Sequence, residues 1–87
     1  MSEAPSTKMA HRVEAYLRAN PIEGLRLWVI SVDEVEQGLQ LNLGVGAPMQ
    51  FGDTRVPEAV NAAIAFALRE EPSLRGRRID VKVDFEA

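Results

Sequence analysis

The 87-residue chain contains no cysteine and a single histidine, His11. Without cysteine, neither a disulfide framework nor a thiolate metal site can form, and His11 is the only imidazole that could bind a metal. Lys8, Arg12 and Glu14 surround it in the sequence, and no serine or carboxylate pair stands at a spacing typical of catalysis. We therefore expect His11 to face solvent. We predict no catalytic, metal-binding or cofactor-binding residues, and a protein that is not an enzyme.

Excess positive charge and long apolar runs are also missing. The net charge is −3 at pH 7, the wrong sign for a domain that neutralises phosphates, so we expect no nucleic-acid partner. The longest wholly apolar run covers residues 62–68, whereas a membrane span needs about 20 residues. The first residues lack the basic and apolar segments of a secretory signal. These features predict a cytoplasmic protein without membrane insertion.

The composition is that of an ordinary folded protein, with 46% hydrophobic and 26% charged residues. A chain of this length can build one hydrophobic core. We therefore expect a single domain over residues 1–87, with residues 1–6 as a disordered N-terminal tail.

Two segments show the periodicity of amphipathic helices. The first should begin at Ser6 or Thr7, either of which could cap it, and should end at Ala19. The second should begin after Asp53 or Thr54 and should end at Glu70. The second helix is apolar almost all round, with three residues beside its main stripe, namely Ala59, Ala62 and Phe66. Either the first helix or another subunit should cover that side.

Three segments are typical of β-strands, at residues 25–32, 39–45 and 79–85. The second and third alternate apolar and polar residues, which predicts one buried face each. The first is apolar in both alternating sets, a pattern typical of a central strand. The acidic residues Asp33, Glu34 and Glu36 should form a solvated hairpin turn before the second strand.

The order of these segments predicts the fold class. We expect an α+β domain with two layers in the order αββαβ and two helices on one face of a three-stranded mixed sheet. The first two strands should pair antiparallel, and the third should run parallel to the second. Placing the first strand in the middle gives the sheet order 2-1-3. Order 1-2-3 is the alternative.

A sheet covered on one face leaves the other face for a partner. A central first strand would show one apolar set there, either Trp28, Ile30 and Val32 or Leu27 and Val29. Such a patch suits self-association through the open sheet face, unless polar neighbours and the packing of Trp28 shield it within a monomer. Two further apolar residues, Met49 and Phe51, lie in a Gly/Pro-rich loop. They should either cover the core or face a partner.

An arginine-rich segment, the Arg69–Arg78 strip, offers a different function. It contains Arg69, Arg75, Arg77 and Arg78. Together with Arg26, these guanidinium groups could bind an anion, unless the neighbouring Glu70 and Glu71 balance them. Gly44 and Gly46 share a spacing with some phosphate loops, but the third glycine and the lysine of such loops are missing.

Two functions follow from these patterns. The first is a small non-enzymatic protein–protein interaction or assembly module, expected to form a homodimer or to bind a larger protein partner. Trp28, Ile30, Met49 and Phe51 are its predicted interaction residues. The alternative is a small-ligand or anion-binding regulatory domain that uses Arg75, Arg77 and Arg78.

Overall fold

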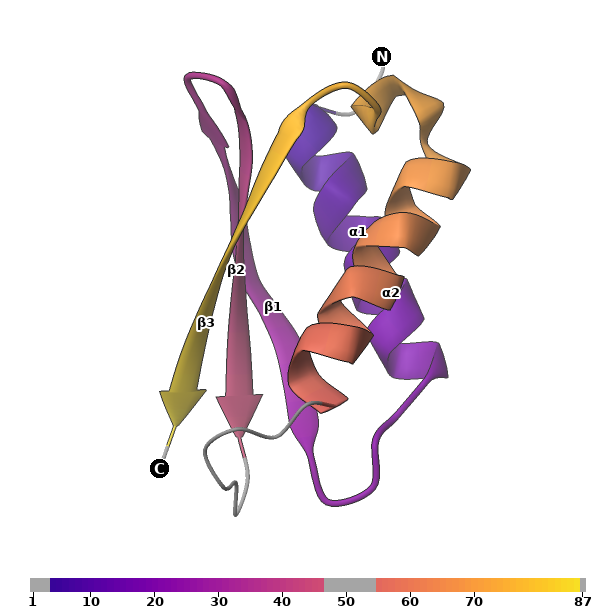
Figure 1. The fold of residues 1–87 in the computed structure, drawn as a ribbon, viewed down its shortest axis with the longest axis vertical. Helices are drawn as coiled ribbons and strands as arrows, with labels where there is room; N and C mark the ends of the chain where they lie inside the picture. The colour runs from indigo at the N-terminus through magenta and orange to yellow at the C-terminus, as the bar shows by residue number, and fades with distance from the viewer. Residues whose placement is uncertain (1–3, 47–54, 87) are drawn as a thin grey trace.

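Two helices cover one face of a three-stranded mixed sheet (Figure 1). The computed structural model describes residues 4–46 and 55–86. Its elements are α1 (Pro5–Ala19), β1 (Arg26–Val35), β2 (Gly38–Gly46), α2 (Arg55–Glu70), the short 3-10 helix η1 (Pro72–Leu74) and β3 (Arg78–Glu86). The predicted α+β class, element order and one-sided helix layer are confirmed. Among these described elements, no helix has the length and apolar character that crossing a membrane requires.

The strand order is β1-β2-β3, with β2 in the centre. The predicted order 2-1-3 is therefore wrong, and the alternative 1-2-3 is confirmed. β1 pairs antiparallel with β2, and β3 runs parallel to β2, both as expected. Since the crossover through α2 joins neighbouring parallel strands, the connection is the simplest that this element order allows.

A central strand needs only one apolar face when the other face of the sheet is open. In β2, Leu39, Leu41 and Leu43 are fully buried beneath the helices. Gly44 and Asn42 lie on the opposite face, because successive side chains of a strand alternate. The clean alternation of β2 is therefore compatible with the central place, and the two apolar faces of β1 have another cause, given below.

The hairpin between β1 and β2 is tighter than predicted. β1 continues to Val35, so Asp33 and Glu34 belong to the strand, and only residues 36–37 form the turn. A β-bulge interrupts β1, where the pairing jumps from Val29 to Ser31 and leaves Ile30 as the extra residue.

α1 begins at Pro5, inside the segment that the sequence assigned to the tail. Its N-cap residue is Ala4, and no side chain caps it, so the predicted cap at Ser6 or Thr7 is wrong. Proline suits the first helical position because its fixed φ is helical and no intrahelical partner exists there for an N–H. The predicted caps of α2, Asp53 and Thr54, lie outside the described residues.

A turn at residues 22–25 leads from α1 into β1. The Leu25 backbone N–H donates to the Ile22 carbonyl at 3.1 Å, which closes a four-residue turn. Gly24 occupies its third position with a φ of 77°. That left-handed conformation favours glycine.

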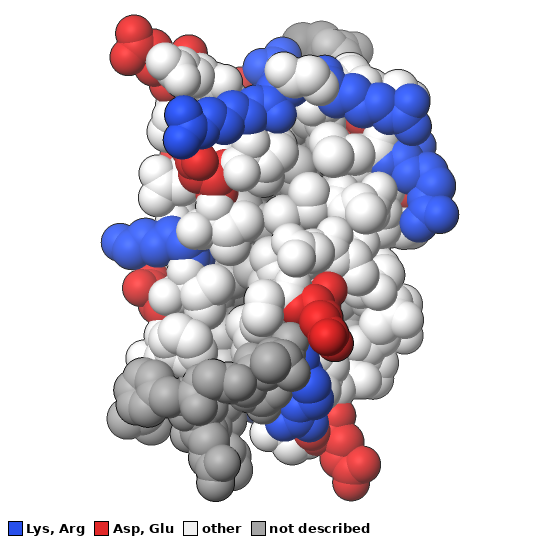
Figure 2. Space-filling model, viewed as in Figure 1, with Lys and Arg blue, Asp and Glu red and all other residues white. Residues whose placement is uncertain are grey.

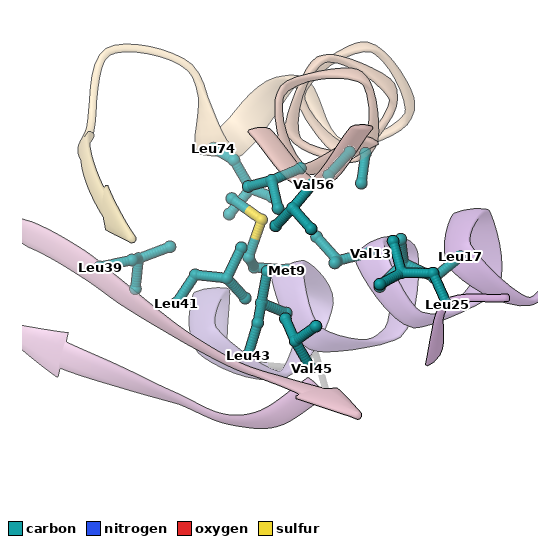
Figure 3. Packing of buried hydrophobic residues seen from close by; sticks show 13 residues of the cluster. Met9, Val13, Leu17, Leu25, Leu39, Leu41, Leu43, Val45, Val56 and Leu74 are labelled. Atoms are coloured by element: carbon teal, nitrogen blue, oxygen red, sulfur yellow. The ribbon is translucent and has the colours of Figure 1, made fainter. Parts of the chain in front are cut away.

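The core lies between the sheet and the helices (Figure 3). Met9 and Val13 of α1 are fully buried against the leucines of β2. Leu74 of η1 is also fully buried, although its segment lies in no predicted element. The complete buried cluster contains Met9, Val13, Leu17, Leu25, Leu39, Leu41, Leu43, Val45, Val56, Val60, Ala63, Ala67 and Leu74.

The helices are tied to each other by an aromatic contact and an ion pair. The rings of Tyr16 and Phe66 lie 5.6 Å apart, which confirms that the first helix covers Phe66. Arg12 of α1 donates from Nε and from one Nη to Glu71 Oε1, at 3.1 and 3.0 Å. The two-sided apolar character of α2 therefore has an explanation within the chain on this side.

Candidate interaction surface

Trp28 lies on the open face of the sheet, packed over the glycines of β2. A Cβ atom at Gly44 would collide with the Trp28 indole, and one at Gly46 would lie 3.1 Å from Trp28 Cζ3. The Arg26 guanidinium sits 5.6 Å from the centre of the indole ring. Because the ring is held between glycines and a cation, Trp28 is only partly exposed. This packing explains why β1 is apolar on a face without helices, and why Gly44 and Gly46 occur at their spacing.

Polar side chains occupy the rest of that face around β2. The Asn42 amide donates to Ser31 Oγ and Asp33 Oδ2, both at 3.0 Å. Its oxygen accepts a hydrogen bond from Gln40 Nε2 at 3.1 Å. The open face around Asn42 is therefore a hydrogen-bonded polar surface beside a partly shielded indole. The exposed Val35, which pairs with Gly38, lies at the hairpin end of the same face, so the apolar side chains there do not form the patch expected from a central first strand.

Of the other predicted interaction residues, the structure describes only Ile30. Ile30, at the bulge of β1, is 51% exposed. Met49 and Phe51 lie outside the described residues. Their predicted role, and their predicted association with Ile30, stay predictions.

A different apolar surface lies on the helix side of β3. Residues paired across β2 and β3 share a face, so the register of Leu39 with Ile79 through Val45 with Phe85 points the apolar set of β3 toward the helices. The helix layer covers this set incompletely, since Val81 is 41% and Phe85 is 55% exposed. We name as the α2–β3 surface the six apolar residues Ile64, Leu68, Ile79, Val81, Val83 and Phe85.

The two α2 members lie on the flank of α2 that points away from α1. At 100° per residue, Ile64 and Leu68 lie on the flank of α2 opposite Phe66, which contacts α1. Figure 2 shows an uncharged band along the molecule between β3 and α2, with charged side chains toward its margins. The sequence analysis missed this surface because it predicted that one face of β3 is buried. It did not show that the helices leave part of that face exposed.

The arginine strip lies at the end of the molecule where α2 ends and β3 begins, and Figure 2 shows Lys and Arg side chains gathered there. Arg75 Nε donates to the Leu68 carbonyl at 3.1 Å, and Arg78 Nε donates to Asp80 Oδ1 at 3.2 Å. Arg69 and Arg77 are exposed.

Two expectations about this strip need correction. Glu70 and Glu71, which the sequence places beside the arginines, contact Arg12 of α1 instead. Arg26 pairs with Gly46, whereas Arg78 pairs with Gly38, so the two arginines lie at opposite ends of the sheet. Anion binding by the strip therefore cannot include Arg26, and it stays a prediction for the other arginines.

A hollow of about 290 Å³ lies where the end of α1 meets the start of β1. Its lining includes Leu17, Ile22, Leu25 and Trp28. Small-molecule sites usually measure roughly 300–1,000 Å³ and enclose most of their ligand, so this hollow is at the lower limit. Sequence reasoning gave no signal for it.

In the part of the chain that the structure describes, the titratable side chains form no metal-binding cluster. There, no three His, Asp or Glu residues lie close enough together to hold a metal ion. His11 is exposed, as predicted.

Comparison of the chain with protein-family models and with curated proteins found no match. The physical features of its surfaces are therefore the basis for a functional proposal.

Proposed function

We propose that this domain is a small protein–protein interaction or assembly module that acts by binding and not by catalysis. The observation that carries the proposal is the exposure of Val81 on a strand at the edge of the sheet. Large apolar side chains on an unpaired edge strand are a docking template for another chain, which natural proteins otherwise avoid.

The α2–β3 surface supports this function better than the open sheet face does. Ile79 and Val83 flank Val81 on the same face of β3 and are only partly buried. Ile64 and Leu68 of α2 are also partly buried and pack against the same core cluster, so both elements contribute partly exposed apolar side chains. An apolar centre with a charged margin is the usual arrangement of a protein interface.

Site-specific photo-crosslinking in the cells that make the protein tests this function. A diazirine-bearing amino acid would replace Val81 in one variant and Ala15, an exposed residue of α1, in a matched control. We expect a covalent protein adduct from position 81 and none from position 15. The absence of any protein adduct at position 81, in a chain that keeps its circular dichroism spectrum, would contradict the proposal.

A further inference from the structure

We propose that β3 pairs antiparallel with β3 of a second copy of this chain, in a register centred on Val81. The pairing would join two three-stranded sheets into one sheet of six strands, with the helices of both copies on the same face. This inference rests on the proposed function and names its partner.

The two edges of the sheet differ in their suitability for pairing. The β1 edge is interrupted by the bulge between Val29 and Ser31. β3 keeps an unbroken register with β2 from Arg78 to Glu86. Bulges disrupt edge pairing, so β3 is the edge that can accept another strand.

The charges on the open face of β3 select the register. This face carries Arg78, Asp80, Lys82 and Asp84, which pair with Gly38, Gln40, Asn42 and Gly44 of β2. In an antiparallel pair centred on Val81, position 78 lies opposite position 84, and position 80 lies opposite position 82. Each arginine or lysine then faces an aspartate of the second copy. Directly opposite charges of unlike sign stabilise such pairs, and like charges destabilise them.

Registers centred on the charged positions place like charges together. Centring the pair on Asp80 or Asp84 puts each of those residues opposite its own copy. Centring it on Lys82 puts Lys82 opposite itself and Asp80 opposite Asp84 of the second copy. The two-fold axis of such a pair runs perpendicular to the sheet. Residues directly opposite each other in an antiparallel pair have their side chains on the same side of the sheet. One residue must therefore lie opposite its own copy, and the register is named by that residue.

The remaining registers are centred on the apolar positions. Centring the pair on position 83 places Lys82 opposite Asp84 but leaves Arg78 outside the overlap. Centring it on position 79 faces Arg78 with Asp80, but the strands then overlap only over residues 78–80. Centring it on position 85 limits the overlap to residues 84–86. The Val81-centred register alone places a group of opposite charge opposite all four charged positions from residue 78 to residue 84.

The same register brings the apolar positions of the helix face together. Val81 would lie beside Val81 of the second copy, and Ile79 would lie opposite Val83. These contacts would cover the exposed part of Val81. Apolar burial would supply most of the affinity, whereas the exposed ion pairs would mainly fix the register.

Lys82 and Asp84 are available for this pairing, whereas Arg78 and Asp80 would exchange their contact with each other for partners on the second copy. Arg78 holds Asp80 at 3.2 Å within β3, on a side where both side chains are at least half exposed. Within residues 4–46 and 55–86, neither Lys82 nor Asp84 forms an ion pair. A second copy would provide partners for both.

Charge exchange between two variants tests the inference. Asp80→Lys puts two lysines opposite each other at positions 80 and 82, and Lys82→Glu puts two carboxylates there. Each single variant should weaken self-association about tenfold or more in the dissociation constant, because two cross-strand pairs become repulsive. Both side chains are exposed, and the exposed pair of Asp80 with Arg78 contributes little to stability, so the fold should be kept. An equimolar mixture of the two variants restores both pairs and should form a heterodimer, and the chain carrying both changes should self-associate like the wild type.

Sedimentation equilibrium and native mass spectrometry would measure these masses, with circular dichroism as the control for folding. We expect the wild-type chain to form a dimer that depends on concentration. Each single variant should dimerise more weakly, and the mixture of the two variants should dimerise like the wild type. A wild-type chain that stays monomeric at millimolar concentration would overturn the inference, as would a dimer that both single variants leave unchanged. Crosslinking at position 81 separates the two proposals. An adduct with a different protein and none with a second copy would overturn the homodimer while supporting the interaction module.

Discussion

The indole of Trp28 lies over Gly44, the residue directly opposite it in the β1–β2 register. A tryptophan on a sheet face without helices needs a partner surface, and a glycine in the facing strand provides it by removing a side chain. Trp28 and Gly44 are therefore one packing unit.

Gly44→Ala should destabilise the protein by about 1–3 kcal/mol, because the new methyl group would displace the indole. An isolated strand glycine would show the opposite sign, since alanine is normally the better strand residue by about 0.5–1 kcal/mol. Urea unfolding followed by circular dichroism measures the change. In a Trp28→Leu background most of the cost should disappear, and an equal cost in both backgrounds would show that the indole is not its cause.

The Arg12–Glu71 pair should contribute modestly to the packing of α1 against the end of α2. Glu71→Gln should lower the free energy of unfolding by about 0.5–1 kcal/mol, because the two side chains are 40% and 21% exposed and solvent screens them. Glu14→Gln is the matched control, since its pair with Arg18 lies within one helix and is more exposed. It should cost about 0.3 kcal/mol or less. Thermal melts at low and high salt would measure both, and a larger loss for Glu14→Gln would contradict the expectation.

Leu74→Ala should cost about 2–5 kcal/mol, the range for truncating a fully buried leucine. Its neighbour Ser73 is exposed in the same short helix, and Ser73→Ala should change stability by no more than about 0.5 kcal/mol. Chemical denaturation of the two variants compares them directly. Similar values for both would show that η1 does not anchor the crossover to the core.

Gly24→Ala should cost about 1 kcal/mol because the residue has a φ of 77°, where a Cβ atom is strained. A Cβ atom at this position would meet no other atom within 4 Å, so the cost would come from the backbone and not from a collision. Gly24→Asn should cost less, since asparagine tolerates this conformation. Differential scanning calorimetry would rank the three chains, and an asparagine variant less stable than the alanine variant would contradict the backbone explanation.

Much of the fold could be predicted from apolar spacing alone. The alternation of Leu39, Leu41 and Leu43 specifies β2, and the crossover through α2 specifies that β3 runs parallel to it. The strand order could not be predicted in this way, because the sequence does not show that Trp28 covers Gly44 or that a bulge at Ile30 shifts the faces of β1. Leu74 was missed because a single leucine in a turn has no periodicity.

The candidate surface was predictable only in part. The alternation of Ile79, Val81 and Val83 indicates that one face of β3 is apolar, but it does not indicate how far α2 extends over it. Coverage depends on the angle and spacing of the two layers, which a local pattern does not encode. The arginines of the strip were visible in the sequence, whereas their separation from Arg26 depends on strand direction.

The bulge in β1 also bears on how large an assembly can become. A sheet grows into a fibre when both of its outer strands can recruit further chains. Two copies joined along β3 would present only their irregular β1 strands to the outside, so addition would end after one step. The one-residue bulge would then limit the assembly to two copies, because it prevents polymerisation at the outer strands.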